Sequence, residues 1–469
     1  MEKIKNVPLI KKIYNALKVY GKEVNEARAI PDVYDGLKPV QRKVLWAMHK
    51  LNLDSPTKLV KTARLVGDVL GKYHPHGDKS VQDAIAILVN QNISPIYGEG
   101  NWGSIAGDSP AAMRYTLVRL SEFGRQFFDP YYLPVLDLVP NYDGSEKEPV
   151  RLFPSLPQIL LNGGSGIGVG VTVDLPSFTK KSVITTLIDA ATRGGATPES
   201  CYSLLEFVSQ SNSIVRKKPQ RTTLLEFYKT GQGSVKHESR LSVTKEGIVL
   251  TGVAPFQGTS AYMKKIFAAG DLQEVANVQD QSSQWELKIV YALKRGVSAE
   301  TVLPKLEKAL TSIKHYKINI TRRKLIEKNG WRSAHSEFAA SSVPEIINDW
   351  LKQRVELEVK ATTWHLAQLQ QQIRRNEVLR LACKFRDFIF SLAKSTKTDE
   401  QIKSEIEKKL DCSKEEAAFI FDMKWRQLRD LEDAQIEKRM QEQEKQKKSW
   451  EYRVKNPGKY VVAQLEKML

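Results

Sequence analysis

Apolar residues recur at helical spacing through the first ninety positions of the chain. Within residues 9–29 they include Leu9, Ile13 and Leu17, and this pattern predicts an amphipathic helix. The same periodicity predicts three further short helices, at residues 40–51, 57–70 and 80–89. A Gly- and Pro-containing break at residues 71–78 precedes the last helix. Three short helices with a tight turn before the last are typical of a helix-turn-helix unit, whose last helix faces a nucleic-acid groove.

The pattern changes after about residue 150. Alternating and apolar segments such as 234–250 and 285–293 are separated by glycine, proline and helical stretches up to about residue 340. This alternation predicts an α/β domain. Before it, a glycine-rich loop at residues 98–107 leads to a segment of strand character after Tyr115.

A long helix is predicted to begin at Ser342, because Ser342 and Glu345 have the spacing of a capping box. It is expected to run to about Ser395 with near-heptad apolar spacing. Ser413 and Glu416 predict a cap for a further helix over residues 417–431, and the charged segment 433–448 can return antiparallel to the first helix. The result would be a helical stalk with a small knob, or equally an ordinary helical bundle.

Composition sets broad limits on the protein. The 469 residues suggest about three domains, and 41% hydrophobic with 27% charged residues is typical of a soluble globular protein. An apolar run of about 20 residues, as a membrane span requires, is absent from the sequence. The charged amino terminus has no signal-peptide pattern, so we expect a cytoplasmic protein. Three widely separated cysteines, Cys201, Cys383 and Cys412, predict reduced packing residues rather than disulfides.

The formal net charge of +18 points to a polyanionic partner, most simply nucleic acid. The excess of positive charge is concentrated in residues 36–82, which contain nine Lys or Arg and three Asp, a local excess of six. These cations alternate with glycine, histidine and apolar residues, which favours a folded surface that contacts phosphates over a solvated polar tail.

Arg114 and Tyr115 are the strongest candidates for chemistry. A phenol has a pKa of about 10 and becomes a useful nucleophile when a neighbouring cation stabilises its oxyanion. In a basic surround, the pair indicates covalent chemistry on a phosphodiester. The plainer interpretation is a half-buried tyrosine whose hydroxyl is hydrogen-bonded.

Two other motifs admit weaker interpretations. Gly98–Gly103 matches a dinucleotide-binding string, but the residues after it read as loop rather than helix. His74 and His76, separated by one proline, could ligate a metal but fit better as phosphate-contacting imidazoles beside Lys72. The sequence contains no Asp-x-Asp pair, so a magnesium-assisted reaction would need ligands from another chain.

A glycine-rich segment at residues 162–170 carries Ile167 and Val169. It can be a tight turn between strands. It can also present Ile167 as a wedge that inserts between base steps and bends DNA.

Six segments together resemble the A subunit of bacterial type IIA DNA topoisomerases, namely gyrase and topoisomerase IV. They occur in the family's order and spacing, at residues 27–42, 63–78, 100–104, 111–116, 141–146 and 164–170. The strong likeness covers about residues 26–180 and becomes looser beyond.

The resemblance implies an α+β multidomain architecture. Residues 1–30 would form an N-terminal helical arm and residues 31–155 a winged-helix (helix-turn-helix) DNA-gate domain. Residues 156–340 would form an α/β tower domain, and residues 341–469 a long antiparallel coiled coil with a helical C-gate dimerisation knob.

The resemblance also implies residue roles. Tyr115 corresponds to the nucleophile that forms a transient 5′-phosphotyrosyl link in a staggered double-strand break. Arg114 would stabilise the phosphorane, and His74 and His76 match histidines near the scissile site. The remaining matches would grip or bend DNA: Arg28, Lys38, Arg42, Lys43, Arg64, Lys72 and Ile167.

The implied partners are double-stranded DNA, a second copy of this chain through the C-gate, and a B subunit, giving an A2B2 assembly without a membrane contact. Mg²⁺ and ATP are both expected on the B subunit, with no metal site in this chain, and the enzyme would work on the nucleoid. The amino-terminal helix would help to contact the partner.

Two departures from the family pattern lead to further expectations. The chain ends at Leu469 without the carboxy-terminal β-pinwheel, so we expect relaxation or decatenation rather than supercoiling. Lys79 stands where drug-sensitive members carry a small hydroxyl residue, so we expect a weak quinolone response. The alternative functions are a catalytically idle DNA-binding architectural paralogue and, on Gly98–Gly103 alone, a nicotinamide-dependent enzyme.

Overall fold

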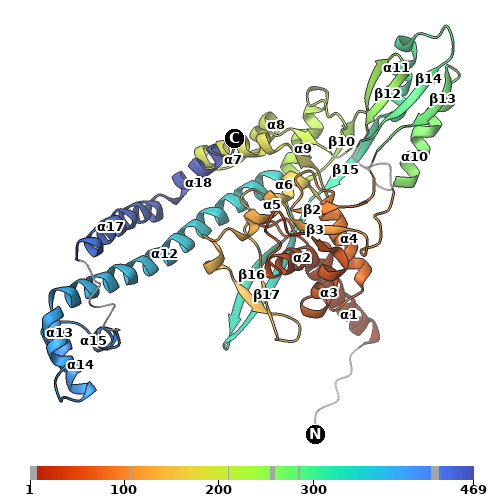
Figure 1. Ribbon diagram of the computed structural model, residues 1–469. Coiled ribbons are helices and arrows are strands. Elements are labelled where there is room, and N and C mark those ends of the chain that lie inside the picture. The colour runs from red at the N-terminus through yellow and green to blue at the C-terminus, as the bar shows by residue number, and fades with distance from the viewer. Residues whose placement is uncertain (1–7, 105–107, 210, 254–258, 284–285, 424–432) are drawn as a thin grey trace. The chain divides into compact units, whose positions relative to one another are not determined.

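The computed structural model describes residues 8–104, 108–209, 211–253, 259–283, 286–423 and 433–469 (Figure 1). These residues belong to two compact units. The first comprises Met1–Arg354 with Val462–Leu469, and the second comprises Val355–Val461.

The predicted amino-terminal helix is present. It consists of α1 (Leu9–Val24) followed by a wider π-helical turn, η1 (Asn25–Ala29). The apolar side chains of α1 remain exposed, with Leu9 at 71%, Ile13 at 50% and Leu17 at 58%. These apolar side chains therefore do not pack against the described part of this chain.

Three helices and a small sheet form the next part of the first unit. The helices are α2 (Pro39–Lys50), α3 (Thr62–Lys72) and α4 (Asp78–Val89). The antiparallel sheet has the order β1-β3-β2, from β1 (Val60–Lys61), β3 (Leu117–Leu120) and β2 (Ile96–Glu99).

The expectation of a helix over residues 57–70 is wrong at its start. Val60 and Lys61 pair with Val118 and Leu117 of β3, so the helix begins only at Thr62. A strand partner more than fifty residues away outweighs the local helical period.

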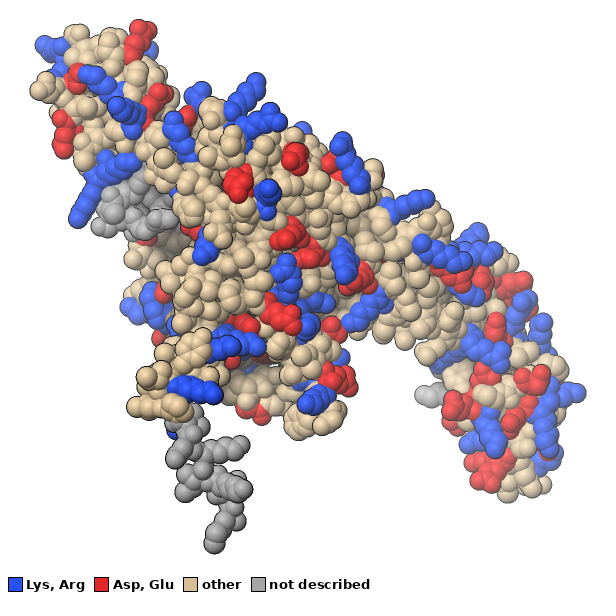
Figure 2. Space-filling model, turned by 180° about the vertical axis from the view of Figure 1, so that it is seen from behind, with Lys and Arg blue, Asp and Glu red and all other residues tan. Residues whose placement is uncertain are grey.

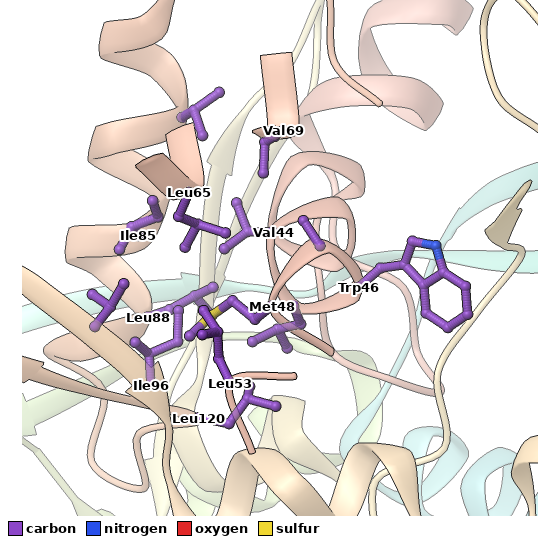
Figure 3. Packing of buried hydrophobic residues seen from close by; sticks show 14 of the residues in the cluster. Val44, Trp46, Met48, Leu53, Leu65, Val69, Ile85, Leu88, Ile96 and Leu120 are labelled. Atoms are coloured by element: carbon purple, nitrogen blue, oxygen red, sulfur yellow. The ribbon is translucent and has the colours of Figure 1, made fainter. Parts of the chain in front are cut away.

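One core unites these helices and strands. Figure 3 shows side chains from all three helices meeting those from the strands β2 and β3. The labelled members are Val44, Trp46, Met48, Leu53, Leu65, Val69, Ile85, Leu88, Ile96 and Leu120, and each is at most 3% exposed. Burial of a side chain of this size contributes about 1.5–3 kcal/mol, so the helix positions are firmly set.

Short elements connect this part to the next. They are α5 (Glu122–Arg125), η2 (Gln126–Phe128), η3 (Leu133–Val135), the paired strands β4 (Leu138–Pro140) and β5 (Lys147–Pro149), and α6 (Gln158–Asn162).

The expectation of mixed helices and strands between residues 150 and 340 is confirmed. One antiparallel sheet has the order β10-β15-β7-β6, from β10 (Gln232–His237), β15 (Ser312–Lys317), β7 (Thr172–Leu175) and β6 (Gly164–Ile167). A second has the order β11-β12-β14-β13, from β11 (Arg240–Thr244), β12 (Gly247–Gly252), β14 (Ile289–Leu293) and β13 (Val275–Asp280). Trp285, at the start of one predicted strand, lies outside the described residues.

The remaining elements of this region are helices and two-stranded ribbons. The helices are α7 (Lys180–Arg193), α8 (Pro198–Leu204), η4 (Lys218–Gln220), α9 (Arg221–Thr230), α10 (Thr259–Ala268), η5 (Ala269–Asp271) and α11 (Ala299–Leu310). The ribbons pair β8 (Ser177–Phe178) with β9 (Phe207–Val208), and β16 (Asn319–Lys328) with β17 (Trp331–Ala340).

The long helix α12 (Val343–Lys384) begins at the predicted capping box. Ser342 N–H donates to Glu345 Oε2 at 2.8 Å, and Glu345 N–H donates to Ser342 Oγ at 3.4 Å. The expected continuation to Ser395 is wrong, because Phe385 leaves the helical conformation (φ −102°, ψ 25°) and a new helix, α13 (Arg386–Ala393), follows.

The second unit continues with α14 (Asp399–Leu410), α15 (Lys414–Phe421) and α17 (Asp433–Lys455). The last helix, α18 (Pro457–Glu466), begins in the second unit, and its residues from Val462 belong to the first. The predicted cap of α15 is present, since Glu416 N–H donates to Ser413 Oγ at 3.2 Å. Residues 424–431 of the helix predicted there lie outside the described residues.

The charged segment returns antiparallel to α12, as predicted. Asn376 donates to Gln443 at 2.8 Å, while Arg380, further along α12, binds Asp433 at 2.9 Å, earlier along α17. At the other end, Arg453 pairs with the buried Glu358.

Two further observations concern the described residues. Cys201, Cys383 and Cys412 form no disulfide, and Cys201 and Cys412 are buried. Among the helices of the described residues, none is long and apolar enough to cross a membrane.

Candidate functional site

Tyr115 ends a turn that lies one residue before β3. Its side chain is 64% exposed, and the guanidinium carbon of Arg114 lies 4.8 Å from the centre of its ring. The interpretation of a half-buried tyrosine is therefore wrong. The phenol is exposed, and the guanidinium of Arg114 lies over its ring.

The histidine pair lies just beyond the end of α3. The rings of His74 and His76 stack with centroids 4.5 Å apart. Partial burial, followed by the nearby charges of His76, Lys43 and Arg28, lowers the pKa of His74 to about 4. At pH 7 the His74 imidazole is therefore neutral, so it can donate a hydrogen bond but adds no positive charge to this surface.

The charges of Arg28, Lys43 and His76 all lie near enough to His74 to lower its pKa. Lys43 also donates to the carbonyl of Tyr73 at 2.6 Å and lies 3.3 Å from Glu148, so part of its charge is compensated. Among the described residues, Tyr115 forms no ring contact with either histidine.

The other predicted phosphate contacts differ in exposure. Arg28 and Arg64 are exposed, Lys72 is partly exposed and lies 3.1 Å from Asp68, and Lys38 is partly buried. Burial lowers the pKa of Lys38. Figure 2 shows that basic and acidic side chains are interspersed on the face it draws, so that face carries no single continuous basic patch.

The prediction that Arg42 contacts DNA is wrong. Arg42 is 3% exposed, and its guanidinium binds Asp35 through Nε at 2.6 Å and Nη2 at 2.9 Å. Nη2 also donates to the carbonyl of Leu37 at 3.2 Å. We therefore remove Arg42 from the proposed DNA contacts and assign it a structural role.

Ile167 lies at the end of β6, at the tip of the β6–β7 hairpin, and is 86% exposed. The glycine-rich segment is thus a turn between strands that also presents a bare apolar side chain. Asn25 of η1 holds the tip, because its Oδ1 accepts from Val169 N–H at 2.8 Å. A side chain at Gly168 would place Cβ 2.0 Å from that same oxygen, so the glycine is required for the close approach.

The dinucleotide-binding interpretation of Gly98–Gly103 is wrong. Gly100 and Gly103 have positive φ values of 99° and 91°, and the described residues between β2 and β3 contain no helix. A pyrophosphate site of that type needs a helix amino terminus directly after the glycines. Gly107, in the same predicted loop, lies outside the described residues.

The hypothesis that His74 and His76 ligate a metal ion is not supported by the side chains described around them. Among the described residues, no three His, Cys, Asp or Glu side chains cluster as metal ligands would.

Sequence reasoning missed the residues that hold Tyr115 in place. Thr62, Gln82 and Thr116 bond to the segment around it. Thr116 follows Tyr115 directly in the motif, but a lone threonine carries no signal for a buried hydroxyl pair. Only the fold brings Thr62 to it.

Comparison with known proteins decides the family. Residues 28–467 match the family model that describes the A subunit of DNA gyrase and topoisomerase IV. The chain belongs to this family.

The relatives found in this family are longer than the part of them that this chain matches. The A subunit of DNA gyrase from Helicobacter pylori (strain ATCC 700392 / 26695) is 30% identical over 436 residues, which cover 90% of this chain and 51% of the relative. The A subunit of DNA gyrase from Clostridium acetobutylicum is 31% identical over 443 residues, which cover 89% of this chain and 50% of the relative. The chain spans about half the length of the curated relatives it matches.

Proposed function

We propose that this chain is the DNA breakage-and-rejoining subunit of an ATP-dependent type IIA topoisomerase. The observation that carries the proposal is the exposed phenol of Tyr115 beside Arg114, at the motif that the family resemblance assigns to the nucleophile. Exposure is shared with other tyrosines, such as Tyr452 at 61%. The proposal therefore depends on the exposed phenol together with Arg114 and the family motif.

In the proposed reaction, the Tyr115 oxygen attacks a backbone phosphorus. The O–P bond to tyrosine forms as the bond from phosphorus to the 3′ oxygen breaks. The phenol proton passes to solvent, and the departing 3′ oxygen takes up a proton. One phosphoester replaces another, so the reverse attack by the 3′-hydroxyl reseals the strand. Arg114 stabilises the negative charge that builds up on the phosphorane.

DNA would be gripped by the predicted cations and imidazoles other than Arg42. This proposed set comprises Arg28, Lys38, Lys43, Arg64, Lys72, His74 and His76. Each phosphate neutralised releases counterions, which makes the binding salt-dependent. Ile167 would enter between base steps and bend the duplex, since an exposed branched side chain on a glycine-framed hairpin has the shape of such a wedge.

Within the two compact units, we propose a finer division into functional modules. We assign α2, α3, α4 and the sheet β1-β3-β2 to a winged-helix domain over residues 31–155. The arm would be residues 1–30 and the tower residues 156–340. Within residues 341–469, α12 and α17 would form the antiparallel coiled coil, and α13, α14 and α15 the C-gate knob for homodimerisation.

A B subunit would complete the enzyme as an A2B2 assembly on the nucleoid in the cytoplasm. Following the family resemblance, we assign Mg²⁺ and ATP to that partner. The bare apolar side of α1, including Ile13 at 50% exposure, supports a contact between this helix and another chain.

Reconstitution tests the proposal. The chain is mixed with candidate type IIA B subunits, Mg²⁺ and plasmid, and the reaction is stopped with detergent. We expect linear DNA with protein attached to its 5′ ends. DNA that is bound and bent without a covalent link would instead identify an architectural paralogue. With ATP, the same mixture measures relaxation, decatenation and supercoiling, and the sequence-based expectation of the first two stays a prediction.

A further inference from the structure

The segment that carries Tyr115 also caps helix α3. The first amides of an α-helix lack partners within the helix, and α3 has no side-chain cap at its start. Here Thr62 N–H donates to the carbonyl of Thr116 at 3.0 Å, and Ala63 N–H donates to the carbonyl of Met113 at 3.2 Å. The helix start and the backbone on both sides of Tyr115 are thus one hydrogen-bonded assembly.

A buried hydroxyl pair fixes this assembly from the inside. Thr116 Oγ1 donates to Thr62 Oγ1 at 2.8 Å, and the two residues are 1% and 0% exposed. Threonine is stiff at χ1, and a buried hydroxyl that loses its partner has no water to replace it. The pair therefore ties the residue after Tyr115 to one position on α3.

Helix α4 holds the same segment from a second direction. Gln82 Nε2 donates to the carbonyl of Ala111 at 3.0 Å, four residues before Tyr115. The backbone on both sides of Tyr115 is thus hydrogen-bonded to α3 and α4, while its side chain is exposed. Its backbone is held between two helices whose inner faces belong to the core of the first unit.

We propose that Thr62, Thr116 and Gln82 are positioning residues for the cleavage reaction, which set the place of the Tyr115 oxygen through the backbone of its turn. The inference rests on the proposed function. Attack on phosphorus requires near-contact distance and alignment with the leaving oxygen, and a displacement of about 1 Å can cost a hundredfold in rate. None of the three needs to touch DNA.

The test compares Thr116→Val with Thr116→Ser. Valine keeps the shape of threonine and removes the hydroxyl, whereas serine keeps the hydroxyl. In single-turnover cleavage with the B subunit, we expect Thr116→Val to lower the rate about ten- to a hundredfold at unchanged DNA affinity. Thr116→Ser should recover most of the rate. Gln82→Leu should show the same separation of rate from affinity.

Two further variants separate positioning from stability. Thr186→Val is the matched control, because Thr186 is 0% exposed and its hydroxyl donates to the Ser182 carbonyl at 2.7 Å on α7. It should lower the melting temperature and leave the cleavage rate unchanged. The double variant Thr62→Val/Thr116→Val removes both hydroxyls, so it should recover stability while cleavage stays slow.

The outcomes are distinct. A wild-type rate in Thr116→Val, no recovery in Thr116→Ser, or an equal rate loss in Thr186→Val would each overturn the inference and leave the proposed function intact. A wild-type chain that forms no covalent complex with any candidate B subunit contradicts the proposed function, and the inference falls with it.

Discussion

Arg42 and Asp35 form a buried two-point ion pair at the start of α2. Nε of Arg42 lies 2.6 Å from Asp35 Oδ2, Nη2 lies 2.9 Å from Oδ1, and the side chains are 3% and 0% exposed. Asp35 Oδ2 also accepts from Leu152 N–H at 3.0 Å. The pair therefore joins α2 to a segment more than a hundred residues away.

Replacement of Arg42 should damage the fold rather than DNA contact. Arg42→Ala leaves a buried carboxylate without its cation, which typically costs about 3–5 kcal/mol. Chemical denaturation should show this loss. Arg64→Ala, at an exposed position on α3, is the control and should change stability by no more than about 0.5 kcal/mol while weakening DNA binding. The assignment is contradicted if Arg42→Ala is as stable as wild type.

Ile167 should matter for DNA shape and not for stability. Because it is 86% exposed, Ile167→Ala should change the free energy of unfolding by no more than about 0.5 kcal/mol. In a Tyr115→Phe background, fluorescence transfer between the ends of a short duplex should report less bending. Ile313→Ala, also exposed (70%) on β15, is the matched control and should bend DNA normally. Equal bending by both variants would rule out the wedge.

His74 should make stability depend on pH. Its pKa in the folded chain, about 4, lies below the ordinary value of 6.5 because of burial and nearby cations. Between these values the unfolded chain binds the proton first, so stability falls as pH drops from about 6.5 to 4. The slope of unfolding free energy against pH should flatten in His74→Gln and stay unchanged in His315→Gln, an exposed histidine on β15. An unchanged slope in His74→Gln would contradict this account.

Lys79 should limit the response to quinolones. It is 69% exposed at the start of α4 and lies 2.8 Å from Asp83, where the family resemblance places a small hydroxyl residue that anchors the drug. Drug-stabilised cleavage should be weak in the wild type and stronger in Lys79→Ser. Efficient drug-stabilised cleavage by the wild type would refute the expectation.

Local patterns predicted much of this architecture. The helices α1, α2 and α4 and the caps at Ser342 and Ser413 follow from periodicity and cap chemistry, which depend on a few adjacent residues. The strand at Val60 was missed because its partner, Val118, is distant in sequence.

Long-range effects also explain the corrections at the site. Arg42 has the charge of a phosphate contact, but whether a cation faces solvent depends on Asp35 and the packing around both. The hydroxyl pair of Thr62 and Thr116 likewise appears only when α3 meets the turn of Tyr115. The residue types in the sequence indicated the chemistry of the site. Only the fold shows which of those side chains are accessible.

Tyr115 is the proposed nucleophile of DNA cleavage. To test this role, the detergent-trapped complex is digested with nuclease and protease. Mass spectrometry then locates the peptide that carries a nucleotide. We predict a 5′-phosphotyrosyl link on Tyr115 in the wild type. We predict none in Tyr115→Phe, which should still bind DNA. A covalent link on another residue, or an undiminished link in Tyr115→Phe, would contradict the account.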